Sequence, residues 1–364
     1  MHKLPPTIVR LAIPIAVAIG FNTLDPPRAA GQPSPAVESA PPSASTRATS
    51  AAGLSALDVW TFKALPYYEP LTAEPRAARI ELTIPAWAKE FPHSEKPGSR
   101  FAWQVTLGRE LPIVGIRSER LDGRVGSGQW GLGLWTPVSF HMIEDFKDES
   151  APIVDTDYRF GAMVKFQYGL REDLWLGVKF VPWAHESTHL GDEYVILAAN
   201  NPSFERINVS YENWEYGVSF EGSGLLSADD SWTFRHGGLK PWGNDGYYSD
   251  HLLGDAAQTL TPSQKNYEPS FGAEYVWPEW RGRHWYVSAE ARHRLVYTYH
   301  QTANNPERRQ WSWNLQVGRT VPPGTTGTPL KQYFVQVYHG VNPYGQLRSQ
   351  RSWWSAGFGW IFGL

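Results

Sequence analysis

The feature that most constrains this chain is a two-residue alternation of apolar and polar side chains that recurs along most of its length. In residues 285–297, for example, one face is mainly apolar and aromatic, and the other carries Ser288, Glu290, Arg292 and Arg294. Successive side chains of a β-strand point to opposite faces, so this pattern predicts strands with one apolar and one polar face.

The alternation predicts long strands, of about 9–15 residues, which suit a tilted membrane crossing better than the 5–6 residues usual in soluble proteins. Approximately twelve such segments occur, and an even number is typical of bacterial outer-membrane barrels. The expected strands are 79–87, 101–117, 128–142, 158–169, 173–187, 207–221, 231–238, 267–279, 284–297, 309–320, 331–342 and 350–363.

Aromatic residues, 14% of the chain, gather near the expected strand ends, where rings can lie at a lipid interface. The chain also closes on an apolar, aromatic strand, and short connections such as 170–172 alternate with long ones such as 239–266. We therefore expect an all-β fold, an antiparallel transmembrane β-barrel of about twelve strands in the bacterial outer membrane. The alternative is a soluble, lectin-like sandwich, in which the apolar face meets a second sheet.

The N-terminal part has a different composition. Residues 1–31 combine early basic residues, an apolar run and a small-residue end, which predicts a signal peptide. Residues 32–61, rich in Pro, Ser and Ala at their start, are expected to be a disordered linker, and 62–364 the barrel domain. Export of such a barrel implies the barrel-assembly machinery as a partner, whereas a net charge of −3 argues against nucleic acid. No cysteine is present, so a disulfide framework and thiolate chemistry are excluded.

The segment His185-Glu186-Ser187-Thr188-His189 matches the H-E-x-x-H signature of zinc peptidases. That chemistry needs a helix, because only a helix brings positions i and i+4 to one face around a metal. Here the motif follows an alternating strand, in which the two histidines would lie about 13 Å apart. We expect no zinc site.

A second interpretation uses His185 and Ser187, which share one side of a strand, so that the histidine could act as general base toward the hydroxyl. This H-x-S pair resembles the catalytic pair of outer-membrane phospholipase A and of the lipid A deacylase PagL. The resemblance implies Ser187 as nucleophile, His185 as base and outer-leaflet lipid as substrate, with no cofactor, although a calcium requirement stays open. Asp192 is the preferred third member, His189 a further candidate, and Glu193, Asn208 and Glu212 are rivals to Asp192.

The side on which this pair lies is left open by the sequence. His185 and Ser187 have the same parity as Lys179, which is expected to face the barrel interior, whereas the enzymes named above carry their pairs on the lipid side. Pro182 could mark a bulge that reverses the side. Alternatively the pair faces the lumen or an outer loop.

A longer resemblance runs from about Phe62 to Leu364 and is carried by five segments. Their most specific part is the block 185–193, in which Glu186 departs from the usual Gln. In this order the segments resemble the uncharacterised bacterial family called domain of unknown function 1207, which supports a barrel and implies no activity. The segments are Pro70–Arg76, Asp155–Tyr158, His185–Glu193, Arg206–Glu212 and Asn342–Gln346.

Two functions follow as hypotheses. One is a serine acyl hydrolase that acts on outer-leaflet lipid. The other is a barrel without enzymatic activity, a pore or a structural surface protein, in which the polar block anchors an outer loop by hydrogen bonds.

Overall fold

The computed structural model describes residues 58–61, 68–89, 101–118, 125–146, 151–192, 210–242, 267–281, 283–296, 308–320, 330–348 and 350–362. Within these ranges the chain consists of β-strands, their connections and one short 3-10 helix, η1 (Gly345–Leu347). No helix in this described part is long and apolar enough to span a membrane. The predicted signal peptide lies outside the described residues.

Thirteen strands are formed by the described residues, and twelve of them were expected from the alternation. They are β1 (Asp58–Thr61), β2 (Ile80–Ala88), β3 (Ala102–Arg117), β4 (Trp130–Asp145), β5 (Ile153–Arg171), β6 (Leu174–Leu190), β7 (Ser210–Ser223), β8 (Ser231–Trp242), β9 (Glu268–Val276), β10 (Trp285–Val296), β11 (Arg308–Thr320), β12 (Leu330–Gly340) and β13 (Trp353–Phe362).

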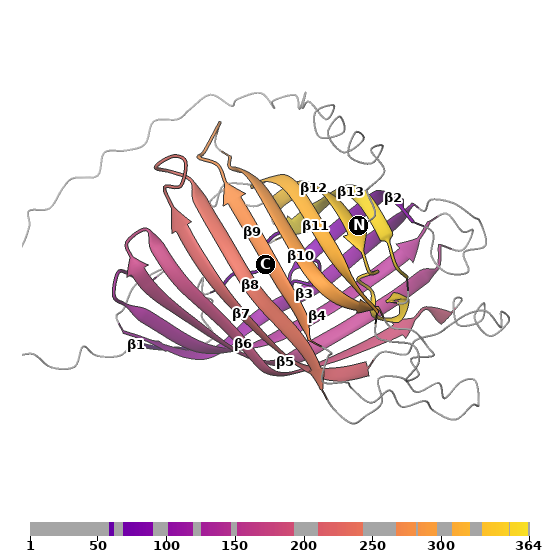
Figure 1. The fold of residues 1–364 in the computed structure, drawn as a ribbon, viewed down its shortest axis with the longest axis horizontal. Coiled ribbons are helices and arrows are strands. Elements are labelled where there is room, and N and C mark those ends of the chain that lie inside the picture. The colour runs from indigo at the N-terminus through magenta and orange to yellow at the C-terminus, as the bar shows by residue number, and fades with distance from the viewer. Residues whose placement is uncertain are drawn as a thin grey trace, which may run out of the picture. The chain divides into compact units, whose positions relative to one another are not determined.

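The strands β2 to β13 form one antiparallel sheet in which each strand pairs with its neighbours in the sequence (Figure 1). The last strand pairs with the first, because Phe362 of β13 lies opposite Ile80 of β2, so the sheet closes into a barrel. The prediction of an all-β, twelve-stranded antiparallel barrel is confirmed. The sandwich alternative is wrong, since closure leaves no second sheet for the apolar face to meet.

The strand β1 extends the wall beside β3. Its four residues pair with Val114–Arg117, whereas β2 pairs with β3 farther along, from Glu81 to Thr83. Both β1 and β2 therefore run antiparallel to the same strand. The strand β1 occupies the last four residues of the range 32–61, and the other residues of that range lie outside the described part of the chain.

The two ends of the barrel differ in their connections. At one end, here called the turn end, β5 leads to β6 through two residues, and β7 leads to β8 through 224–230. At the other, the loop end, β12 leads to β13 through 341–352 and β6 leads toward β7 through 191–209. The alternation of short and long connections expected from the sequence is thereby confirmed for these strands.

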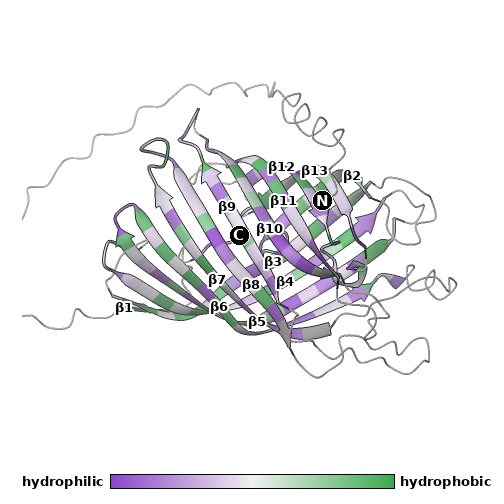
Figure 2. Ribbon diagram, in the orientation of Figure 1, coloured by the Kyte–Doolittle hydropathy of each residue, from purple (hydrophilic) through white to green (hydrophobic). Residues whose placement is uncertain are grey.

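Hydrophilic and hydrophobic residues alternate along the strands of the barrel (Figure 2), and their burial shows which of them face the inside. Along β5, Asp155, Asp157 and Lys165 are buried, whereas Tyr158 and Phe160 between them are exposed. Along β10, Ser288, Glu290 and Arg294 are buried on the interior face, as the sequence predicted. This arrangement is that of a barrel whose outer face meets lipid.

Residues 68–79, here called the luminal segment, lie inside the barrel. Their backbone and side chains bond to interior residues of three neighbouring strands that lie far from this segment in the sequence. Thr72 donates to Glu274 of β9, the Ala73 N–H donates to Ser288 of β10, and Asn314 of β11 donates to the Ala73 carbonyl. The lumen is therefore filled by the chain's own residues at this level.

Glycines of the wall make room for the luminal segment. A Cβ added to Gly217 would lie 1.8 Å from the Tyr68 hydroxyl, and one added to Gly272 would lie 2.2 Å from a Leu71 methyl. Real side chains do not approach so closely, so these two positions accept the segment only because they lack a side chain.

The loop end of the lumen is covered by residues 341–350, here called the cap loop. Its Tyr344 and Leu347 are buried together with wall residues such as Ile143 and Trp353. The Gly345 N–H donates to the Asp157 carboxylate of β5 at 3.2 Å. Burial raises the pKa of Tyr344 well above its usual value, with nearby Asp157 adding to the shift, so this phenol stays neutral.

The turn 224–230 is organised by one carboxylate. Asp230 accepts hydrogen bonds from the backbone N–H groups of Leu225, Leu226 and Ser227 and from the Tyr275 hydroxyl. Desolvation alone would raise the pKa of Asp230, but these four donors outweigh it and hold the pKa well below its usual range. The ionised carboxylate is thus part of the turn's structure.

Candidate functional site

The strand β6 changes its inward-facing parity halfway along. Lys179 and Val181 are buried, but Ala184, Glu186 and Thr188 are buried beyond them. The pairing with both neighbouring strands shifts at this point, between Ala162 and Val164 of β5 and between Val181 and Ala184 of β6. This irregularity is a bulge at Pro182, one of the possibilities that the sequence left open, and it reverses the side chains that follow.

As a result, His185, Ser187 and His189 all lie on the outer face of the barrel near its loop end. Their cross-strand neighbours confirm the face, because His185 packs on the exposed Phe160 and His189 on the exposed Tyr158. The alternative in which the pair faces the lumen is wrong. The three residues occupy the end of the strand, where an interface with polar headgroups would lie.

The hydroxyl of Ser187 contacts His189 rather than His185. Its Oγ lies 3.2 Å from His189 Nε2, which is hydrogen-bonding distance. With the ring proton on Nδ1, Nε2 can accept the serine proton, and this is the geometry that a general base requires. Ser187 is half-buried and His189 is exposed, so the pair is open to a ligand on the outer face.

His185 has a different partner. Its Nδ1 lies 3.4 Å from Glu212 Oε1 of β7, directly opposite in the sheet register. Both side chains are about a quarter exposed, at 28% and 25%. Glu212, one of the rivals expected from the sequence, is thus the carboxylate that orients an imidazole at this site.

Asp192, the preferred third member, is exposed beyond the end of β6. Within the described residues it makes no hydrogen bond to His185 or His189. Glu193 and Asn208, two further rivals, lie outside the described residues. The outer face therefore presents a Ser187–His189 pair and a His185–Glu212 pair side by side.

The inner face of the same stretch carries a separate polar cluster, here called the arginine clamp. Arg76 of the luminal segment contacts Glu186 of β6 at 2.5 Å and Asp157 of β5 at 3.1 Å. Because Asp157 also accepts the Gly345 N–H of the cap loop, the clamp joins the luminal segment, two wall strands and the cap. Four segments singled out in the sequence, around Arg76, Asp157, Glu186 and Gly345, meet here.

A second group of ion pairs holds the luminal segment at Glu74. Lys179 contacts Glu215 of the neighbouring strand β7 at 2.5 Å, and Arg159 contacts the same carboxylate at 2.5 Å. Glu74 lies 3.5 Å from Arg235 and 3.8 Å from Lys179. Burial would raise the pKa of Glu74, but these two cations lower it below its usual value.

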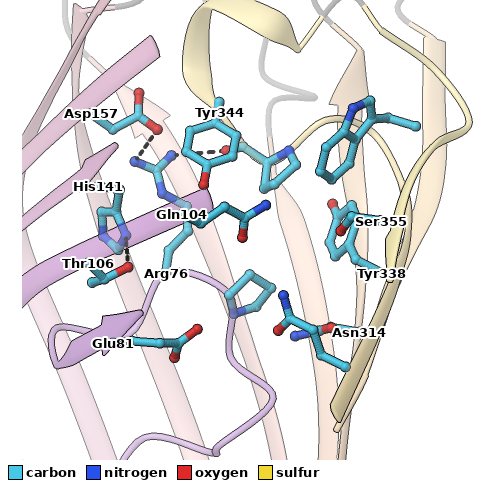
Figure 3. Close-up of a pocket in the computed structure, with 14 residues that line it drawn as sticks. Arg76, Glu81, Gln104, Thr106, His141, Asp157, Asn314, Tyr338, Tyr344 and Ser355 are labelled. Atoms are coloured by element: carbon cyan, nitrogen blue, oxygen red, sulfur yellow. Dashed lines mark hydrogen bonds and ion pairs between the residues drawn. The ribbon is translucent and has the colours of Figure 1, made fainter. Parts of the chain in front are cut away.

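Next to the clamp, and partly lined by it, lies a polar chamber between the luminal segment and the cap loop (Figure 3). It is lined by Arg76 and Asp157, by His141 with its partner Thr106, and by Tyr344 of the cap. His141 Nδ1 lies 3.1 Å from Thr106 Oγ1, and Nε2 lies 3.2 Å from Ser139 Oγ. Sequence analysis missed this histidine, because a single His in an alternating strand carries no motif.

The H-E-x-x-H match lies in a strand, as predicted. Its glutamate faces the lumen, paired with Arg76, while both histidines face outward. In the part of the chain that the structure describes, no group of three or more His, Cys, Asp or Glu side chains could hold a metal ion. The expectation that the protein needs no zinc stays a prediction, as does any role for calcium.

The fold and this site define a class, a closed β-barrel of the outer-membrane type with a filled lumen. Residues 13–225 match the family model described as protein of unknown function DUF1207, so the chain belongs to that family. A comparison with curated proteins returns no match.

Several solved barrels are similar to the chain in outline. Outer membrane phospholipase A from Escherichia coli is 12% identical over 81% of this chain and 93% of its own, with a TM-score of 0.42. The beta domain of the Bordetella autotransporter BrkA is 8% identical over 79% and 99%, with a TM-score of 0.34. Acinetobacter baumannii OccAB3 is 8% identical over 78% and 98%, with a TM-score of 0.26.

Proposed function

We propose that the protein is an outer-membrane barrel that hydrolyses ester bonds of outer-leaflet lipid, with Ser187 as nucleophile. The observation that carries this proposal is the 3.2 Å contact between Ser187 Oγ and His189 Nε2 on the outer face. A serine with a base in reach on the outer face of a membrane barrel suits acyl transfer from a lipid ester.

The membrane position rests on the arrangement of the two faces. Large apolar side chains such as Phe160, Phe180 and Trp183 are exposed on the outside, whereas charged side chains such as Lys165, Lys179 and Glu215 are buried on the inside. A bacterial barrel that keeps the ends of β2 and β13 in the periplasm has its loop end at the cell surface. Ser187 then lies at the level of the outer leaflet.

In the proposed reaction, His189 Nε2 accepts the Ser187 proton as Oγ attacks the ester carbonyl. The same proton then passes to the departing alcohol. In the second half of the reaction His189 takes a proton from water, which attacks the acyl-enzyme, and returns that proton to Ser187 Oγ as the fatty acid leaves. His185, held by Glu212, is a second imidazole beside the nucleophile and contacts the lipid headgroup or the developing oxyanion. The earlier assignment of His185 as base changes to His189 because that ring is the one in contact with the hydroxyl.

The test is covalent labelling combined with a lipid-hydrolysis assay. The purified barrel in mixed micelles should release fatty acid from phospholipid or lipid A, assayed with and without calcium, and a fluorophosphonate should label Ser187. His189→Ala should remove both signals, whereas His339→Ala, a matched change of an outward histidine on β12, should preserve them. If no lipid ester is cleaved, or if Ser187→Ala is labelled as well as the wild type, the proposal is wrong.

The competing function is a barrel without enzymatic activity. The filled lumen favours a structural surface protein over a pore, since the luminal segment and the cap loop occupy the space through which solutes would pass. Planar-bilayer recordings test this point, and the absence of conductance together with the absence of hydrolysis would favour the structural role.

A further inference from the structure

A small cavity in the lumen is surrounded by charged side chains. In the described part of the chain it is lined by five arginines, four glutamates and one leucine, contributed by the luminal segment, the cap loop and the wall. The members are Glu74, Arg76, Arg159, Glu186, Glu215, Leu239, Glu268, Arg292, Arg294 and Arg348.

Four of the five arginines have a carboxylate partner. Arg76 contacts Glu186 and Arg159 contacts Glu215, each at 2.5 Å. Arg348 of the cap loop is bonded to Glu268. Arg292 contacts Glu290, which lies on the same strand, at 3.0 Å.

Arg294 is the exception. It projects inward from β10 and is only 3% exposed, yet among the described residues it makes no ion pair or hydrogen bond. Its titratable neighbours are the phenol of Tyr338, the arginines Arg348 and Arg292, which repel it, and Glu268, whose carboxylate is bonded to Arg348. The guanidinium thus faces a cavity in which the Glu268 carboxylate already has a cationic partner.

A buried guanidinium without a counter-charge is costly, and arginine does not lose its proton in proteins. Such a group is stable only where an anion or polar partner takes up its donors. The free space beside it is on the order of one or two water molecules, which sets the size of an occupant.

We propose that Arg294 binds a small inorganic anion of about the size of chloride inside the barrel. The anion would sit among Arg294, Arg292 and Arg348 and neutralise the excess positive charge of the cavity. Because Arg348 belongs to the cap loop, the bound anion would also hold the cap against β10. This site is independent of the outer-face serine, so the two proposals succeed or fail separately.

Bromide tests the site directly, since it replaces chloride and scatters anomalously. Crystals of the intact protein grown with sodium bromide should show an anomalous peak beside the Arg294 guanidinium. In solution, the unfolding temperature of the detergent-solubilised wild type should rise when gluconate, too large for the cavity, is replaced by chloride or bromide at constant ionic strength.

Arg294→Met is the informative variant, because it removes an unpaired charge and should fold. It should abolish the halide-dependent shift, whereas Arg171→Met, at an exposed arginine of the turn end, should keep the whole shift. The proposal is overturned if the wild type shows no anomalous peak, or if Arg294→Met responds to halide as the wild type does. If a carboxylate from residues 243–266 occupied the cavity in place of an anion, the wild type would show no anomalous peak and the proposal would be wrong.

Discussion

Glu186 and Ser187 are neighbours in the sequence, yet they belong to two regions with opposite character. Glu186 is 3% exposed and lies in the arginine clamp, where it is bonded to Arg76. Ser187 lies on the outer face, with a single histidine in contact and free access from outside. The block 185–189 therefore interleaves two sets of residues, an inner one that holds the luminal segment and an outer one available for chemistry.

The contrast between the two faces predicts which substitutions should affect stability and which should affect activity. A change on the inner face removes a buried charge partner, whereas a change on the outer face removes only exposed, weakly packed atoms.

The largest loss of stability is expected for Arg76→Ala. This change leaves Glu186 and Asp157 buried without their cation, and breaking a buried ion pair typically costs about 3–5 kcal/mol. Denaturant titration in detergent, followed by heat-modifiability on gels, measures the effect. Arg171→Ala, which removes the exposed pair with Asp173, is the matched control and should change stability by less than about 1 kcal/mol. Equal effects of the two variants would contradict the clamp.

A smaller loss is expected for Gly217→Ala. The new Cβ would overlap the Tyr68 ring, and overpacking of this kind costs about 1–3 kcal/mol. Adding Tyr68→Ala removes the overlapping ring, so the double variant should lose less stability than the sum of the two single variants. Additive losses would mean that Tyr68 does not occupy this position in the lumen.

The sequence established the fold but only part of the site. Period-two alternation is a local signal, so strands such as β10 could be located without knowledge of their partners. The bulge at Pro182 was one of several possibilities, because the reversal of parity depends on how β5 and β7 pair with β6. The contact of Ser187 with His189 instead of His185 depends on side-chain rotamers, which sequence spacing does not determine.

The position of the luminal segment inside the barrel was not predicted, for a related reason. Residues 70–76 were recognisable as a motif, but they have no periodicity, and their partners lie far away in the sequence, as Thr72 and Glu274 illustrate. Only the closed barrel brings them together. Glu212 was one of several carboxylates considered, and the register of β7 selects it as the partner of His185.

The smallest effect is expected at the turn end. The folded-state pKa of Asp230 is depressed, so its stabilising contribution is present above the pKa of the unfolded chain, about 4, and is lost as the pH falls below it. The unfolding temperature of Asp230→Asn should therefore fall below that of the wild type at pH 7, and the two should converge at acid pH. A difference that persists unchanged at low pH would contradict an ionised carboxylate in this turn.

The most direct measurement of the central claim compares Ser187→Ala with Glu186→Gln in one assay of fatty-acid release and one of unfolding. The account predicts that Ser187→Ala loses hydrolysis to background, while its free energy of unfolding stays within about 0.5 kcal/mol of the wild-type value. It predicts the reverse for Glu186→Gln, which should unfold more readily but retain hydrolysis in its folded fraction. Hydrolysis that survives Ser187→Ala, or that is abolished in folded Glu186→Gln, would contradict the division of this strand into a structural inner face and a catalytic outer face.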